Sequence, residues 1–567
     1  MNKRILFLMA AIAMAGSLFA QHNEEVTVEG TYRPKVNKVT KIKLSPEKPQ
    51  QTFTMPSSEV QPKLTDRKFD IELDKLGAMA YSNKDDKTVQ PAQNFLMAGL
   101  GTRLSPLFLY RHDSPLTKDV NLGVGISHFS SWVNMKDHPK SGFMNNLCDV
   151  KVDAKLQSHQ LTGKVFYKND LYHYYGYRLS DSLIPTARID ELCPKTVNNI
   201  IGVSAMLSST ETQLQQLQHA IGVDYRYAFG RAVEHYAALN GHLAWTDSWW
   251  GNRAYPQEVG MDLGLQYDHY NNAEALQNEP KQVSRFLLDV NPYFAMKGDF
   301  YKLHLGFRFD YTSADSVKIC FRPDLQGSLY VFDKKLEFYA GLGGGKQLNT
   351  AMELFEANPF ISTRAYHDNY QNVRLSFDAG LRTIVADKVG LHAGVRYRKT
   401  ANDFFFVQDE NSMAAIYNVF NQYRILYDNT ERVSVVADVR WKIIDGLQLE
   451  LGGAYNSMKP EREEKAWYRP TFEGNLKVDY ALNEQLSFNA NLLYKGGIYA
   501  KVYKGYNIWE SEKLKDIVDL SLGADFKLND KVTIFGKLNN VANCKYPMYY
   551  DYPVTGIEFF AGVKMKF

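Results

Sequence analysis

The sequence predicts an all-β protein: a transmembrane antiparallel β-barrel of about 22 strands, preceded by a short extended periplasmic segment. Three observations lead to this fold class. Segments of about ten residues alternate between apolar and polar side chains, the connections between them are alternately short and long, and aromatic residues are abundant, with 36 Tyr and 32 Phe in 567 residues. Tyr and Phe favour β structure and gather at membrane interfaces, and a tilted strand of about ten residues crosses a bilayer.

The first twenty residues form a separate unit. Lys3 and Arg4 precede a short apolar run, and small residues follow as far as Ala20. This pattern is typical of a secretory signal peptide, with cleavage expected after Ala20, and a buried N-terminal helix is the alternative. Removal of Lys3 and Arg4 lowers the formal net charge from +3 to +1. Such a balance does not suggest nucleic acid as a partner.

Residues 21–94 have a different composition from the rest of the chain. Lysine, proline, threonine and glutamate are frequent, and five prolines are spread between Pro34 and Pro62. This composition predicts an extended, largely irregular periplasmic segment. It contains too few apolar residues for a substantial core of its own, so we expect at most a reduced plug.

From about residue 95 to Phe567 the alternation is continuous, which predicts one barrel domain, 95–567. The final segment illustrates it, because side chains alternate across a strand and each segment acquires one apolar and one polar face. The apolar face of this segment carries Ile557, Phe559, Ala561, Val563, Met565 and Phe567, and the other face carries Glu558, Phe560, Gly562, Lys564 and Lys566. A membrane barrel needs such faces because lipid lies outside and a polar lumen inside.

The connections support the barrel over a water-soluble sandwich, which also alternates. Short turns are expected near 298, 334, 387, 445, 483 and 529, and long loops at 176–198, 346–371, 404–431, 456–469 and 499–514. Short periplasmic turns and long outer loops are typical of outer-membrane barrels. The strand count is about 22, with 20 as the alternative, because the region 200–260 is hard to divide.

Aromatic runs and cysteines give further expectations. The run 169–178 and the Trp pair at 249–250 are expected in a membrane girdle, with ligand stacking as the alternative. Cys148 and Cys193 lie beside predicted outer loops, so they are the favoured disulfide pair in an exported protein, although sequence does not fix connectivity.

No catalytic, cofactor or metal-binding motif is found. The chain has no GxSxG, HExxH or P-loop sequence, and no two cysteines have metal-ligand spacing. We therefore expect no enzyme activity, no cofactor and no metal site.

The C-terminal stretch resembles the last hairpin of TonB-dependent receptors. That hairpin has an Asn-rich turn followed by Lys and Tyr, a Tyr/Pro-rich loop, and a Gly-aromatic strand that ends in Phe. The matching residues here are Asn540, Val541, Ala542, Asn543, Lys545, Tyr546, Gly556, Phe559, Phe560 and Phe567. The resemblance implies a receptor-sized barrel in the cell outer membrane, with Phe567 as the signal for outer-membrane insertion.

Near the N-terminus, Glu25, Val26, Thr27 and Val28 resemble a TonB box, which would bind by adding a strand to a partner's sheet. An ordinary β-prone tail is the alternative. The chain departs from the family in its front segment, since residues 21–94 are about half as long as the family's plug domain. The resemblance implies TonB-driven import, but the short front segment argues against it.

Two function classes follow. The first is uptake or passage of a ligand across the outer membrane, with outer-membrane lipid around the barrel and TonB as a partner. The second is a barrel without a plug that acts as a structural or assembly subunit of a larger outer-membrane complex, with other envelope proteins sealing it. A barrel of this size encloses a wide lumen. We expect the N-terminal segment, inward-folded outer loops or a partner to close it.

Overall fold

The computed structural model describes residues 94–567 except 182–184, 186–187, 211–214, 251–254, 272–281, 314–316, 363–369, 387, 413–414, 416 and 418. The expected signal peptide, the segment before residue 94 and the TonB-box-like residues Glu25, Val26, Thr27 and Val28 lie outside the described residues. Among the described residues, no helix is long and apolar enough to cross a membrane.

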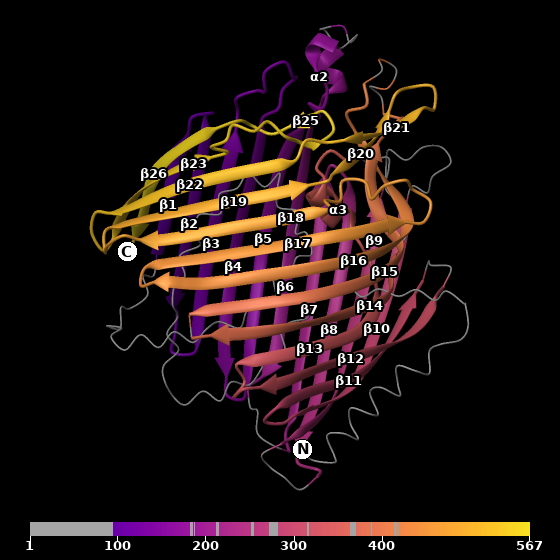
Figure 1. Ribbon diagram of the computed structural model, residues 1–567, viewed down its shortest axis with the longest axis vertical. Helices are drawn as coiled ribbons and strands as arrows, with labels where there is room; N and C mark the ends of the chain where they lie inside the picture. Colours follow the sequence, from indigo (N-terminus) through magenta and orange to yellow (C-terminus); the bar gives the residue numbers. More distant parts are fainter. Residues whose placement is uncertain are drawn as a thin grey trace.

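The described chain folds into one closed antiparallel barrel of 22 strands, as predicted (Figure 1). Each strand pairs with its neighbour in the sequence, and the first strand also pairs with the last, from Phe95 opposite Lys566 to Gly101 opposite Phe560. The strands of the first half are β1 Asn94–Gly101, β2 Ser105–Pro115, β3 Val120–Ser131, β4 Phe143–Leu156, β5 His159–His173, β6 Lys195–Ser209, β7 Leu217–Gly230, β8 Val233–Asp247, β9 Gln257–Asn271, β10 Gln282–Lys297 and β11 Tyr301–Thr312. Those of the second half are β12 Ile319–Val331, β13 Leu336–Gln347, β14 Gln371–Val385, β15 Val389–Gln408, β16 Tyr423–Ile444, β17 Leu447–Pro460, β18 Phe472–Ala481, β19 Leu486–Gly496, β22 Ile517–Lys527, β23 Val532–Asn539 and β26 Glu558–Lys566.

The two faces of the barrel wall have the chemistry that the alternation predicts. On β16, Val433 and Val435 are 41% and 48% exposed on the outside, whereas Ser434 between them is 4% exposed. The last strand repeats this, with Phe559 at 45% and Glu558 at 4%. Apolar side chains outside and polar ones inside reverse the order of a water-soluble protein, which excludes the soluble sandwich.

The two rims of the barrel differ. The chain enters the wall at Asn94 and leaves it after Lys566 at the same rim, and this rim carries the short turns, such as 298–300, 332–335 and 445–446. Short turns identify it as the periplasmic rim. Trp249 and Trp250 lie at this rim with 45% and 66% of their surface exposed, as expected for girdle residues.

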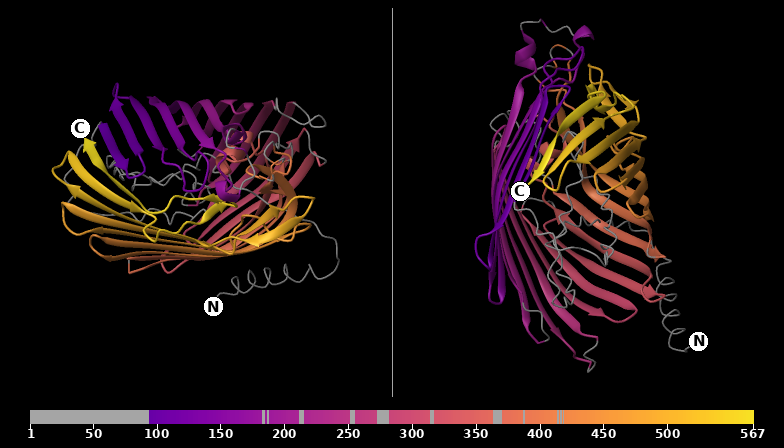
Figure 2. Two further views of the ribbon diagram at one scale, coloured as in Figure 1. Left: turned by 90° about the horizontal axis from the view of Figure 1, so that it is seen from above. Right: turned by 90° about the vertical axis from the view of Figure 1, so that its left-hand side faces the viewer.

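The opposite, outer rim carries the longer connections and, among the described residues, the elements that lie outside the wall. These are η2 Leu179–Asp181, α2 Ile189–Leu192, α3 Ala351–Ala357, β20 Tyr499–Tyr503, β21 Trp509–Lys513, β24 Pro547–Tyr549 and β25 Tyr552–Pro553. In Figure 1, α2, β20, β21 and β25 gather at the top. Seen from above in Figure 2, loop segments lie between the two facing walls of the ring.

The structure corrects two expectations. The predicted long loop at 404–431 is half strand. β15 continues past a bulge between Thr400 and Asp403 to Gln408, and β16 begins at Tyr423, so the loop is only 409–422. The favoured disulfide is also wrong: Cys148 is free and exposed on β4, whereas Cys193 is free and buried at the outer end.

Candidate functional site: a cap over the outer mouth of the barrel

The outer connections fold inward and bury one continuous apolar cluster together with the outer ends of the strands. The cap, as we call it, consists of the described residues of 174–194, 348–370, 461–471, 497–516 and 540–557, which contribute to the cluster, and of 409–422, whose Asn421 bonds Tyr174 and Tyr552 of the cluster. The buried residues of the cluster, which we call the cap core, are Tyr174, Tyr175, Tyr270, Val283, Ala351, Leu354, Phe355, Phe360, Ile361, Phe405, Phe406, Val407, Tyr423, Ile425, Trp467, Tyr468, Ile498, Ala500, Val502, Leu514, Ile517, Tyr546, Tyr549 and Tyr552.

Aromatic rings from separate connections interlock in the cap core. The rings of Phe360 and Tyr552 stack with their centroids 3.6 Å apart, and Tyr175 meets Tyr552 edge-on at 4.9 Å. Tyr423 lies 5.2 Å from Tyr549. Aromatic pairs of this kind contribute about 0.5–1.5 kcal/mol beyond the burial of their surface. The connections therefore hold one another in place.

Three buried tyrosines of the cap core form hydrogen bonds across the cap through their hydroxyl groups. Each of the three donates to a backbone carbonyl of a segment far away in the sequence. The pairs are Tyr175 to Pro553 at 3.1 Å, Tyr423 to Tyr550 at 2.9 Å and Tyr549 to Ala357 at 2.9 Å. Because a buried donor without a partner costs about 1–3 kcal/mol, these bonds fix which loop packs against which.

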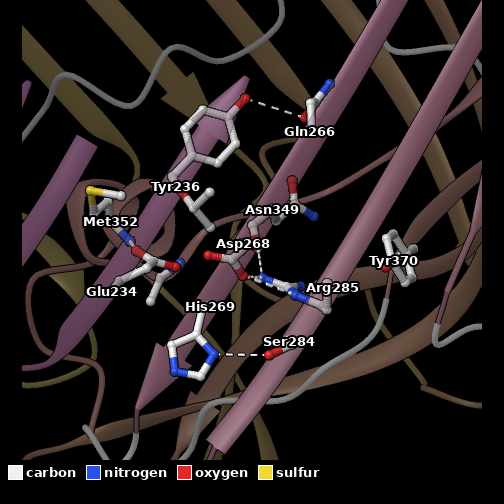
Figure 3. Close-up of polar contacts among 12 residues, drawn as sticks. Glu234, Tyr236, Gln266, Asp268, His269, Ser284, Arg285, Asn349, Met352 and Tyr370 are labelled. Carbon is white, nitrogen blue, oxygen red and sulfur yellow. Dashed lines mark hydrogen bonds and ion pairs between the residues drawn. The ribbon is translucent and has the colours of Figure 1, made fainter. Parts of the chain in front are cut away.

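Helix α3 ties the cap to the barrel wall. Thr350 and Glu353 form a capping box at its N-terminus, with side chain to backbone distances of 3.2 Å in both directions. Glu234, fully buried at the start of β8, adds a second cap from the wall: its carboxylate accepts the N–H groups of Ala351 and Met352 at 2.6 and 2.8 Å. A carboxylate at a helix N-terminus is stabilised by the helix dipole. Figure 3 shows Glu234 directed at Met352.

A buried ion pair anchors the residue just before α3. Arg285 on β10 donates to Asp268 on β9 through Nε at 3.1 Å, and its Nη2 donates to the carbonyl of Asn349 at 2.8 Å (Figure 3). Both charged side chains are at most 1% exposed. At the other end of the same connection, Tyr370 exchanges two hydrogen bonds with the backbone of Phe286, at 2.9 and 3.0 Å. The connection 348–370 is thus pinned at both ends.

Arg231 fastens the middle of that connection. This residue, in the two-residue link between β7 and β8, donates to the carbonyl of Pro359 at 2.8 Å and lies 4.0 Å from the centre of the Phe355 ring. Beside it a cavity of about 20 Å³ is lined by Lys168, Asp170, Glu356 and neighbours. A cavity of this size holds about one water molecule. The gap between α3 and the wall is therefore nearly filled.

Burial favours the neutral forms of two ionisable groups in the cap. Burial raises the pKa of the Cys193 thiol to about 11, although Asn421 donates a hydrogen bond to its sulfur at 3.5 Å. Burial also raises the pKa of Asp551, against the pull of Arg178. Among the described residues, no group of three or more His, Cys, Asp or Glu side chains is placed to hold a metal ion.

The site predicted from sequence and the site observed overlap little. The aromatic run places three tyrosines inside the cap, where Tyr174, Tyr175 and Tyr177 are only 4–5% exposed. The expectation that they belong to a membrane girdle is therefore wrong. Phe567 ends the wall and exchanges two backbone hydrogen bonds with Asn94, at 2.9 and 3.1 Å. The wall anchors Glu234 and Arg285 were missed. The Thr350–Glu353 capping box was a readable signal for α3.

Comparison with known proteins identifies the fold. No family model and no curated protein matches the chain. Solved structures do match. They include the pyoverdine outer membrane receptor FpvA from Pseudomonas aeruginosa PAO1 (12% identity, TM-score 0.63, 85% of this chain and 79% of that one) and the siderophore receptor PirA from Acinetobacter baumannii (9%, 0.62, 85% and 81%). The ferric-catecholate import receptor Fiu from E. coli K12 also matches (9%, 0.59, 84% and 82%). The chain has the outer-membrane barrel fold of TonB-dependent receptors.

Proposed function

We propose that this chain is an outer-membrane receptor-like barrel that takes up a ligand, and that the cap is the gate through which the ligand enters. The observation that carries the proposal is the cap core, in which several outer connections pack against one another at the outer end of the barrel. A closed mouth keeps the membrane sealed, and a ligand that binds the open arrangement better than the closed one would shift the population toward it.

The similar folds support the uptake reading over the assembly reading. The solved structures named above are described as a pyoverdine receptor, a siderophore receptor and a ferric-catecholate import receptor. A structural subunit of a larger complex has no comparable support from the described residues. Energy coupling through TonB, with Glu25, Val26, Thr27 and Val28 as the box, is part of the proposal and rests on the sequence alone.

Uptake of a panel of ferric siderophores labelled with radioactive iron tests the proposal in whole cells. Cells with the intact chain should accumulate at least one panel member, and cells without a working TonB should not. A Val26→Pro variant should assemble normally, as judged by heat-modifiable migration on a gel, and should lose uptake because proline blocks strand addition. A Val133→Pro variant, in an outer loop, is the matched control. Equal accumulation with and without the chain, across the whole panel, would reject uptake of this ligand class.

A further inference from the structure

The inner face of β15 and β16 carries an arrangement that the cap and the proposed function do not explain. Arg398 on β15 stands directly opposite Arg432 on β16, and Arg396 stands opposite Ser434. Residues that face each other across antiparallel strands have Cβ atoms about 4.5–5.5 Å apart, and like charges in such positions destabilise the pair. The guanidinium groups of Arg398 and Arg432 therefore start from adjacent positions on the wall.

These side chains face the lumen. Val395, Val433 and Val435, their neighbours in the alternation, are 41–48% exposed on the lipid side. A hollow of about 10 Å³, which is room for about one water-sized group, lies among Arg396, Arg398, Arg432, Ser434 and Asn456. The polar side chains that line it are three guanidinium groups, a hydroxyl and an amide, so hydrogen-bond donors dominate.

The arginines are held in position by their neighbours. Arg432 donates to Ser434 Oγ at 3.1 Å and to Asn456 Oδ1 at 3.0 Å, and Ser434 also donates to Asn456 Oδ1 at 2.7 Å. Arg396 pairs with Asp378 at 3.1 Å. Asn456 itself donates to Glu473 at 2.9 Å. The two carboxylates thus flank the hollow at its edges, and the guanidinium groups line it.

The position of the hollow places it on the path beneath the cap. On β15, the cap-core residues Phe405 and Phe406 follow Arg398 by seven and eight positions, or roughly 25 Å along a strand. A ligand that had passed the cap would meet this wall next. Guanidinium groups bind carboxylate and phosphate groups bidentately through their planar fork. A bound anion would also offset the repulsion between the Arg398 and Arg432 guanidinium groups.

We propose that Arg398 and Arg432 form an anion-binding site on the lumen wall, beside the Arg396–Asp378 pair, and that it takes a carboxylate or phosphate group of the transported ligand. The assignment of this anion to a ligand in transit rests on the proposed function. The anion site itself does not, because it is a property of the purified barrel.

Calorimetric titration of the purified full chain with inorganic phosphate, and separately with citrate, tests the site at constant ionic strength. The two arms separate phosphate from carboxylate chemistry. The test variant is R398Q/R432Q. The matched control is R440Q, since Arg440 lies on the same face of β16 but pairs with Glu450 at 3.1 Å. We expect binding of at least one anion to the unchanged chain and to R440Q, and a loss of affinity of about ten-fold or more in the double variant.

A second readout keeps the test decisive. Without added anion, the double variant should unfold at the same temperature as the unchanged chain or higher, because the like-charge pair is gone. If R398Q/R432Q does not assemble, the single variant R398Q takes its place. Equal anion binding by all three proteins, or no binding by any of them, would overturn the site. Uptake that fails while anion binding persists would instead reject the proposed function and leave the site standing.

Discussion

The cap core and the inner face of the barrel wall both contain buried side chains, yet the two regions are built in opposite ways. The wall puts apolar side chains outward and keeps ionic pairs such as Arg285–Asp268 inside. The cap core packs aromatic side chains inward, as a water-soluble protein does. The difference follows from the solvent: the outside of the wall meets lipid, whereas both sides of the cap meet water. Substitutions can therefore weaken the cap without disturbing the wall, and other substitutions can weaken the wall without disturbing the cap.

The largest effect is expected from removing two rings of the cap core. Phe405→Ala combined with Tyr552→Ala should destabilise the cap by about 3–5 kcal/mol for each ring, because both side chains are fully buried. Single-channel recordings of the purified barrel should then show a persistent open conductance. Val433→Ala, on the lipid side of the wall, should leave the channel closed. An unchanged conductance in the double variant would mean that the cap is not the seal.

Breaking the buried ion pair of the wall should have the next largest effect. Arg285→Gln leaves Asp268 and Glu234 buried together, which destabilises by about 3–5 kcal/mol. The exposed pair of Lys140 and Asp190, at 2.9 Å, is the control, and Lys140→Gln should cost about 1 kcal/mol at most. Urea unfolding followed by tryptophan fluorescence measures both. A similar loss in the free energy of unfolding in both variants would show that burial does not make the Arg285–Asp268 pair more important than the exposed pair.

A smaller and local effect is expected at the junction of cap and wall. Glu234→Gln leaves one oxygen in place of the two that accept the N–H groups of Ala351 and Met352, and should weaken that end of α3 by about 1–3 kcal/mol. Hydrogen exchange should speed up in residues 350–357. Glu258→Gln is the control, since Glu258 also faces the lumen but bonds Tyr293 at 2.8 Å, away from α3. Faster exchange in both variants would point to general loosening.

The smallest effect concerns the thiol of Cys193. Its pKa of about 11 lies above the ordinary value, because burial favours the neutral thiol. A raised folded-state pKa gives stability that is full below the unfolded pKa of about 8.5 and is lost as the pH rises toward 11. The rate of alkylation by iodoacetamide should therefore stay low at pH 8 and rise steeply above pH 9. Cys193 that reacts at pH 8 as fast as a free thiol would show that the cap is open at rest.

The sequence predicted the wall well and the cap poorly, for physical reasons. Alternation with a period of two is a local property, so residues such as Val518, Phe559 and Met565 could be assigned to the lipid face from their spacing alone. The cap depends on contacts between distant segments, such as Tyr175 with Pro553, 378 residues apart. Tyrosines serve both in membrane girdles and in packed cores, and only the fold distinguishes the two. The Glu234 anchor has no local signature at all.

The seam between β1 and β26 has a consequence for the order of assembly. Asn94 and Phe567 are 473 positions apart and bond each other through backbone and side chain. Pairing over such a distance is slow, so we expect it to form after the intervening strands have paired with their neighbours. Until then β26 is an unpaired strand edge that any other strand could join. If Phe567 is the insertion signal, ring closure is also the event that hides it, and the finished barrel would release its assembly partner without an added trigger.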